Sequence, residues 1–109
     1  MKNEVDKNYT IEVISLKGDI KEQEEDVPSL YKVVLHNDDF TPMEFVIYVL
    51  EKFFYMDRAR AIKITMEAHL KGKAMFGRFT QDIAVTKISE VMDYAKLEEH
   101  PLRCSTEAM

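Results

Sequence analysis

A short polar segment, Asn37-Asp38-Asp39, interrupts the sequence between two apolar stretches. The apolar run Val33-Val34-Leu35 precedes it, and a helical pattern begins soon after Thr41-Pro42. The segment therefore places two carboxylates and one amide at a strand-to-helix junction, beside side chains that bury on either flank. Such a junction can bind a ligand that is cationic at one point and apolar at the next.

Each conspicuous polar residue also has a simpler explanation. Asn and Asp are frequent in turns because their side chains hydrogen-bond to nearby backbone. A turn without any binding function would therefore explain residues 37–39. His69 falls on the apolar side of a predicted helix, where a satisfied core histidine is more common than a ligand-binding group. Spacing alone favours the turn and the core histidine, and leaves the binding functions open.

Catalytic and metal-binding patterns are poorly supported. His36, His69 and His100 lack close metal-ligand spacing, and Asp38 and Asp39 are adjacent rather than on one helical face. Cys104 has only His100 near it in sequence, and there is no Gly-rich phosphate loop or nucleophile elbow. We therefore expect a binding protein that is not an enzyme, with no cofactor and no metal.

Composition narrows the class of protein further. The chain has 109 residues, which fits one small domain, and 46% of them are hydrophobic. A net charge of −5 argues against nucleic acid or an anionic membrane as the main partner. The single cysteine fits a reducing compartment, and no signal peptide or membrane span is apparent. We expect a soluble cytoplasmic protein.

Domain organisation changes near Pro28. Residues 21–26 form a charged run without aromatics, so residues 1–28 are predicted to be a mobile acidic extension. Within it, residues 9–16 alternate partly and could be a short edge strand or a tail segment, with the tail favoured. Residues 29–109 are predicted to be the folded core domain.

The core domain has a dense pattern of strands and helices. The predicted elements, in order, are a central strand 30–36, helices 43–55 and 57–71, a strand 73–80, a helix from residue 80 to about residue 99, and a strand 102–106. This order, β-α-α-β-α-β, predicts an α+β sandwich with three helices packed on a three-stranded antiparallel sheet.

Local signals predict the ends of these elements. Thr41, Asp57 and Thr80 are good N-caps, and Gly72 can end its helix in the left-handed conformation. Gly77 is a candidate bulge. The predicted buried faces are Ala61, Ile62, Thr65, Ala68 and His69 in the second helix, and Ile83, Ile88, Val91, Met92 and Ala95 in the third.

Five segments together resemble one known family. They are YKVVLHNDDFTPMEFVIYVLEKFF at 31–54, RA at 60–61, His69, GKAMFG at 72–77 and EHPLRC at 99–104. The chain resembles ClpS, the adaptor that hands N-degron substrates to the ClpA-type AAA+ unfoldase of the Clp protease. The likeness spans about residues 30–106, and it implies the same three-helix, three-strand fold.

The resemblance implies a function for individual residues. ClpS-type proteins bind the first residue of a polypeptide when it is Leu, Phe, Tyr or Trp. The residues that would surround the free α-amino group are Asn37, Asp38 and His69. Those that would line or border the side-chain pocket are Leu35, Thr41, Met43, Val46, Thr65 and Ala68. Asp39 would hold the loop or meet the peptide backbone. On the opposite surface, the positions that resemble the patch docking the N-terminal domain of the unfoldase are Asp82, Ala84 and Lys87.

The physical chemistry of a peptide N-terminus agrees with these positions. An α-amino group is mostly protonated at neutral pH, so it needs hydrogen-bond acceptors and a nearby negative charge. Met43 and Val46 are three residues apart, and Thr65 is three and four residues from Ala68 and His69. Each set shares a helix face, so the two faces can form one cleft.

Three positions depart from what is usual in the family. Thr65 and Ala68 stand where bulkier Met- and Val-like residues are common, and Asp82 replaces Glu in the docking patch. The expected protein is a monomeric, non-catalytic adaptor. The alternative is a small interaction module that docks a partner without recognising N-terminal residues.

Overall fold

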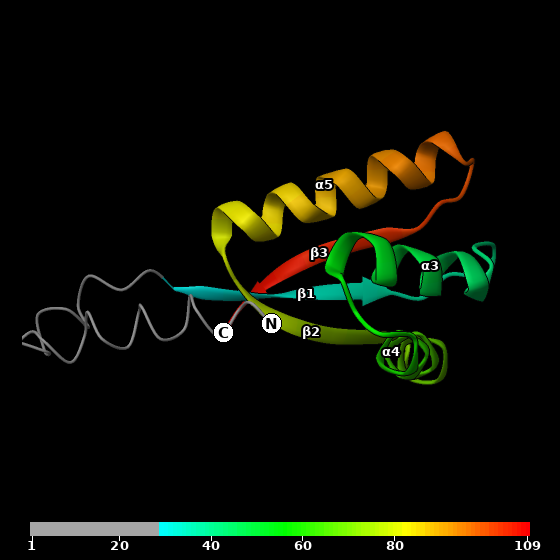
Figure 1. Cartoon of the computed structure of the whole chain (residues 1–109), viewed down its shortest axis with the longest axis horizontal. Coiled ribbons are helices and arrows are strands. Elements are labelled where there is room, and N and C mark those ends of the chain that lie inside the picture. Colours follow the sequence, from blue (N-terminus) through cyan, green and yellow to red (C-terminus); the bar gives the residue numbers. More distant parts are fainter. Residues whose placement is uncertain (1–28) are drawn as a thin grey trace, which may run out of the picture.

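The computed structural model describes residues 29–109, and these form the predicted α+β sandwich (Figure 1). The elements, in order, are β1 (Leu30–His36), α3 (Met43–Phe54), α4 (Arg58–Lys71), β2 (Lys73–Thr80), α5 (Gln81–Leu97) and β3 (Arg103–Ala108). The predictions for residues 1–28, including a strand at 9–16, lie outside the described residues. The order of strands and helices is confirmed, and their ends differ from prediction by at most two residues.

The sheet is antiparallel with β1 in the middle, in the order β2-β1-β3. Leu35 pairs with Ala74 on one side and with Cys104 on the other. The register of β1 and β2 shifts between Tyr31 and Val33, opposite Gly77, which has a φ of 86°. The predicted bulge is confirmed, and glycine suits it because other residues rarely adopt positive φ.

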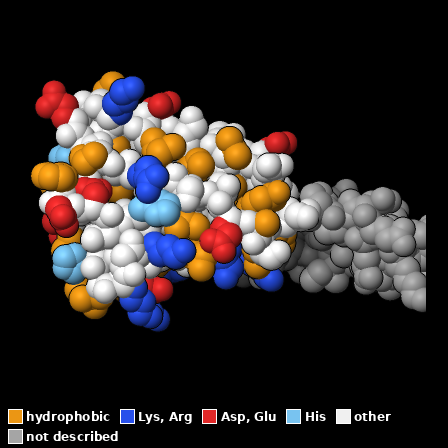
Figure 2. Space-filling model, turned by 180° about the vertical axis from the view of Figure 1, so that it is seen from behind, with side chains coloured by type: hydrophobic (Ala, Val, Ile, Leu, Met, Phe, Trp, Pro, Cys, Tyr) orange, Lys and Arg blue, Asp and Glu red, His pale blue; other side chains and the backbone are white. Residues whose placement is uncertain are grey.

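The helices pack on the sheet around one hydrophobic core. Alternate strand residues, Val33 and Leu35 in β1 and Phe76 in β2, point into this core and meet Leu50 of α3 and Val91 of α5. Figure 2 shows the molecule from behind, where charged side chains of both signs are interspersed with apolar ones.

Of four predicted helix ends, two are formed as expected, one is formed in part and one is not. Asp57 accepts a hydrogen bond from the Arg60 amide at 2.8 Å, and Gly72 ends α4 with a φ of 94°. The prediction of Thr41 as an N-cap is wrong, because Pro42 occupies that position and the Thr41 hydroxyl donates to Asp38 instead. Thr80 does lie at the N-cap of α5, but its side chain makes no capping hydrogen bond.

The predicted buried faces are partly wrong. Ile62 is 38% exposed and Ile83 is 50% exposed, whereas Ile64 is buried in α4. The core side of α4 follows a narrow stripe of Ala61, Ile64, Thr65 and Ala68. Ile62 and His69 follow Ala61 and Ala68 of that stripe by one position, which turns each about 100° around the helix axis from the residue before it.

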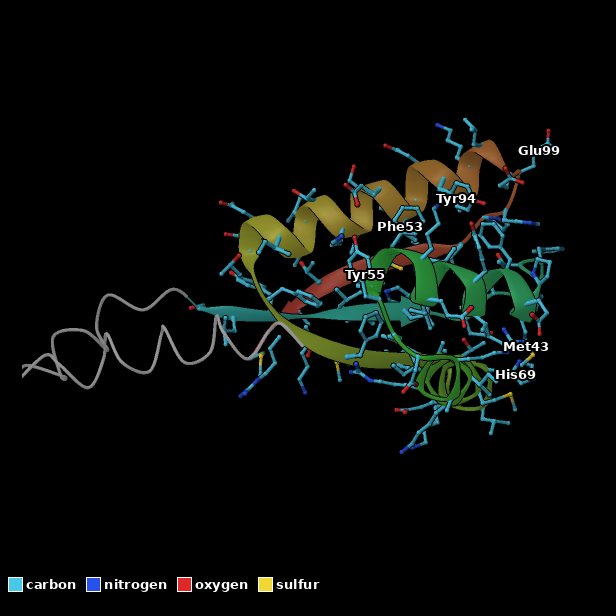
Figure 3. All side chains as sticks on the ribbon, in the orientation of Figure 1. Met43, Phe53, Tyr55, His69, Tyr94 and Glu99 are labelled. Atoms are coloured by element: carbon cyan, nitrogen blue, oxygen red, sulfur yellow. The ribbon has the colours of Figure 1, made fainter. Side chains whose placement is uncertain are left out.

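An aromatic cluster fixes α3 against α5. The Tyr94 ring lies 5.6 Å from both the Phe45 and the Phe53 ring centroids, and Figure 3 shows Phe53 and Tyr94 between the two helices. His100, just after α5, lies 4.4 Å from the Phe45 ring. Because Phe45 belongs to the first turn of α3, these contacts hold the helix end that borders the polar loop.

Candidate functional site

A pocket opens where β1 ends and the polar loop leads into α3. Its free volume is about 290 Å³, the mouth included. The lining residues are Leu35, His36, Asn37, Asp38, Thr41, Met43, Val46, Thr65, Ala68, His69 and Leu102. Met43 of α3 and His69 of α4 lie near each other at this end of the molecule (Figure 3). The pocket is thus formed by one strand end, one loop and the faces of two helices.

The Asp38 carboxylate organises the loop. Its Oδ1 accepts hydrogen bonds from the Phe40 and Thr41 amides at 2.8 and 2.7 Å, and its Oδ2 accepts one from the Thr41 hydroxyl at 2.8 Å. The backbone N–H of Asn37 donates to the Gly72 carbonyl at 3.0 Å, and this bond connects the loop to the end of α4. The expected turn is confirmed, and it places Asn37 and Asp38 at the pocket.

The charge of Asp38 is stabilised where it lies. Partial burial alone would raise the pKa of its carboxyl group, but the three hydrogen bonds from Phe40 and Thr41 and the nearby His100 outweigh this. The pKa of Asp38 is therefore lowered from its ordinary value. At neutral pH this side of the pocket carries a full negative charge.

The pocket changes from polar to apolar with depth. Its mouth has exposed Asn37 and His69, and Met43 is 36% exposed. Its inner walls are formed by buried Leu35, Val46, Ala68 and Leu102. The interpretation of His69 as a core histidine is wrong, since its side chain belongs to the exposed rim.

Nine of the ten residues predicted to bind a ligand line this single pocket, although they come from one strand, one loop and two helices within residues 35–69. Asp39 is the exception: it is exposed and does not line the pocket. This placement brings nine of the predicted residues together around one cavity.

Two lining residues, His36 and Leu102, were not among the predicted ligand-binding residues. His36 directly precedes the polar loop, and Leu102 directly precedes β3. The antiparallel pairing of His36 with Arg103 brings them to the same pocket. The apolar character of Leu102 after Pro101 indicates that it is buried. Only the strand register, however, places it next to the end of β1.

His36 is held on the sheet by Ser105, whose Oγ lies 2.8 Å from the His36 Nε2. The pKa of His36 is lowered by partial burial first, and then by the positive charges of Arg103 and Lys73. His36 therefore favours its neutral form at neutral pH, which leaves the acidic side of the pocket without a competing imidazolium at this position.

The predicted docking patch lies far from the pocket, at the start of α5, while the pocket adjoins the start of α3 (Figure 1). Asp82 is exposed. The Lys87 Nζ lies 3.9 Å from a Glu90 carboxylate oxygen and 5.0 Å from the centroid of the Tyr55 ring. Ala84 is fully buried, so its inclusion as a surface contact is corrected: its methyl group packs beneath the patch.

Residues 29–109 give little support for metal-binding or thiol chemistry. Within residues 29–109, no group of three or more His, Cys, Asp or Glu side chains could hold a metal ion. Cys104 is a buried free thiol, and burial raises its pKa to about 12, which disfavours a thiolate. No helix in this part of the chain has the length and apolarity needed to cross a membrane.

The chain thus has an apolar pocket with a polar, negatively charged mouth on a small α+β sandwich, which is a candidate ligand-binding site. Residues 26–105 match the family model of the ATP-dependent Clp protease adaptor protein ClpS. The chain belongs to the ClpS family, and it is an adaptor of the Clp protease.

Individual relatives agree with this assignment. The chain is 54% identical to the ClpS adapter of Roseobacter denitrificans over 80 residues, which cover 73% of this chain and 71% of that protein. It is 47% identical to the ClpS adapter of Vibrio cholerae over 104 residues, which cover 93% and 96%. Among solved structures, Agrobacterium tumefaciens ClpS2 bound to L-phenylalaninamide has a TM-score of 0.74 and 42% identity, covering 76% of this chain and all of that one.

Proposed function

We propose that the pocket binds the first residue of N-degron substrates when that residue is Leu, Phe, Tyr or Trp. The protein then delivers these substrates to the ClpA-type AAA+ unfoldase of the Clp protease. The observation that carries the proposal is the arrangement of acceptor groups and negative charge at the mouth of a buried apolar pocket. A free peptide N-terminus has the matching chemistry, a cationic amine next to an apolar side chain.

The α-amino group would be held by Asn37, Asp38 and His69. The Asn37 amide oxygen and a ring nitrogen of His69 can accept its hydrogen bonds. Asp38 already accepts three hydrogen bonds from its own loop, out of about four that a carboxylate can take. Its contribution is therefore mainly its negative charge and the position of the loop, with one lone pair left for the ligand.

The side chain would enter between α3 and α4. Burying a Leu or Phe side chain contributes about 1.5–3 kcal/mol, and each charged hydrogen bond about 1.5–3 kcal/mol. After ordering costs, a dissociation constant of about micromolar or somewhat tighter is expected. The ligand of the Agrobacterium tumefaciens ClpS2 structure, L-phenylalaninamide, combines the same two chemical features.

Delivery would use other parts of the chain. Asp82 and Lys87 would dock the N-terminal domain of the ClpA-type unfoldase, with Ala84 supporting them from below. Residues 1–28 would take part in the hand-off. The protein would act as a cytoplasmic monomer and would catalyse no reaction itself.

A titration with two labelled peptides that differ only in their first residue tests the proposal. A peptide that begins with Phe should bind in a saturable manner, whereas its twin that begins with Ser should bind far more weakly. Equal binding of the two would favour the alternative, a module that docks a partner without recognising N-terminal residues.

A further inference from the structure

The Thr65 hydroxyl is an exception among the buried groups of the pocket. Thr65 is 4% exposed and lines the pocket, and its Oγ1 has no hydrogen-bond partner within the protein. Among residues 29–109 it is the only buried polar side chain in this condition. The neighbouring inner walls, Leu35, Val46 and Leu102, are apolar and offer it no partner.

An unpartnered buried hydroxyl has a free-energy cost. Buried polar groups in folded proteins nearly always have a partner, because a group without one loses its hydrogen bonds to water and regains nothing. Threonine in a helix can donate to the carbonyl four residues earlier, but this bond with Ala61 is not formed here. The Thr65 Oγ1 is itself buried, so a molecule that fills the pocket as far as Thr65 could supply the missing partner.

The position of Thr65 fits the far end of an aromatic side chain. His69 lies on the exposed rim, and Thr65 lies one helical turn earlier in α4, about 6 Å along the helix axis. A side chain whose α-amino group is held near His69 and whose ring follows α4 inward ends close to Thr65. A tyrosine side chain has about this length.

We infer that Thr65 is a specificity-determining residue, whose hydroxyl hydrogen-bonds the phenol of an N-terminal tyrosine and favours Tyr over Phe. This inference rests on the proposed function of the pocket. A threonine hydroxyl can both donate and accept, so it can partner a phenol in either direction. In a wholly apolar pocket the phenol would lose its hydrogen bonds to water without replacement, and Phe would be the better ligand.

The test measures the dissociation constants of two peptides that differ only in Tyr or Phe at the first position. In Thr65→Val, which keeps the volume and removes the hydroxyl, the ratio of Phe to Tyr dissociation constants should fall about fivefold relative to the wild type. Thr65→Ser keeps the hydroxyl and should keep most of the preference. Thr86→Val, an exposed threonine on α5, should leave the ratio unchanged.

A second readout checks that Thr65→Val remains folded. Because the substitution removes an unpartnered buried hydroxyl, the ligand-free variant should unfold at a temperature equal to or above that of the wild type. If Thr65→Val is folded and keeps the wild-type ratio, the inference is overturned while the proposed function stands. If the wild type binds neither peptide, the proposed function itself fails, and the inference fails with it.

Discussion

Thr41 donates to Asp38 twice, through its amide at 2.7 Å and through its hydroxyl at 2.8 Å. Both residues line the pocket, so the bonds that hold the loop also set the shape of the mouth. This dual use of Asp38 separates it from Asn37 and His69, which are exposed at the same mouth.

Replacing Asp38 should therefore affect stability and binding together. Asp38→Ala should lower the free energy of unfolding by about 1–3 kcal/mol, because two amides and one hydroxyl lose their acceptor. It should also weaken binding of a Phe-initiated peptide by about tenfold or more. Urea unfolding and peptide titration measure the two effects.

Acid should remove this difference in stability. The pKa of Asp38 is lowered in the folded protein, so its contribution is complete above the ordinary carboxyl pKa of 3.8 and is lost as pH falls through the lowered value. Asp39→Ala is the matched control, since Asp39 is exposed and does not line the pocket. Equal stability of Asp38→Ala and Asp39→Ala at pH 7 would contradict this account of the loop.

Pocket width should control the choice between Leu and aromatic residues. Thr65 and Ala68 are small, so Leu fills the space incompletely and forfeits dispersion contacts that Trp and Tyr can make. The double variant Thr65→Met, Ala68→Val should shift the preference toward Leu. The measurement is the ratio of dissociation constants for Leu- and Trp-initiated peptides, and an unchanged ratio would reject this explanation.

Most of the fold could be predicted because its signals are local. The strand-to-helix junction at residues 37–42, the cap at Asp57 and the glycines at 72 and 77 each specify nearby backbone. The error at Thr41 has a local cause too. Its hydroxyl and its amide both donate to the Asp38 carboxylate, which makes Thr41 part of the loop, and α3 begins only after Pro42.

The rest of the site depends on contacts between distant segments. Leu102 reaches the pocket through the pairing of β1 with β3. Ala84 is buried because α5 packs on the sheet along Ala84, Val91 and Ala95, a stripe that begins one residue after Ile83. Periodicity gives the width of such a stripe but not its edges, which are set by the opposing surface.

Charge reversal at Lys87 should impair docking without affecting the pocket. Lys87 lies on α5, at a distance from the pocket residues, and contacts Tyr55 and Glu90. Lys87→Glu should keep the wild-type affinity for a Phe-initiated peptide and bind the N-terminal domain of a ClpA-type unfoldase more weakly. Lys96→Glu makes the same change of charge near the other end of α5 and serves as the control. Equal docking by both variants would remove Lys87 from the proposed surface.

Deleting residues 2–26 should separate binding from delivery. The pocket residues all lie between 35 and 102, so peptide affinity should stay close to the full-length value. The truncated protein should still dock the unfoldase, yet fail to promote degradation of an N-degron substrate, because it lacks the segment that is proposed to take part in the hand-off. The rate of substrate loss measures delivery, and equal rates for both proteins would leave the segment without this function.

Acetylation of the peptide tests most directly the claim that the pocket recognises a free N-terminal residue. Acetylating a Phe-initiated peptide removes the positive charge and leaves the acceptors of Asn37, Asp38 and His69 without their donor. In a titration of the wild-type protein, the acetylated peptide should bind at least about tenfold more weakly than its free twin. Equal affinities for the two peptides would contradict the claim.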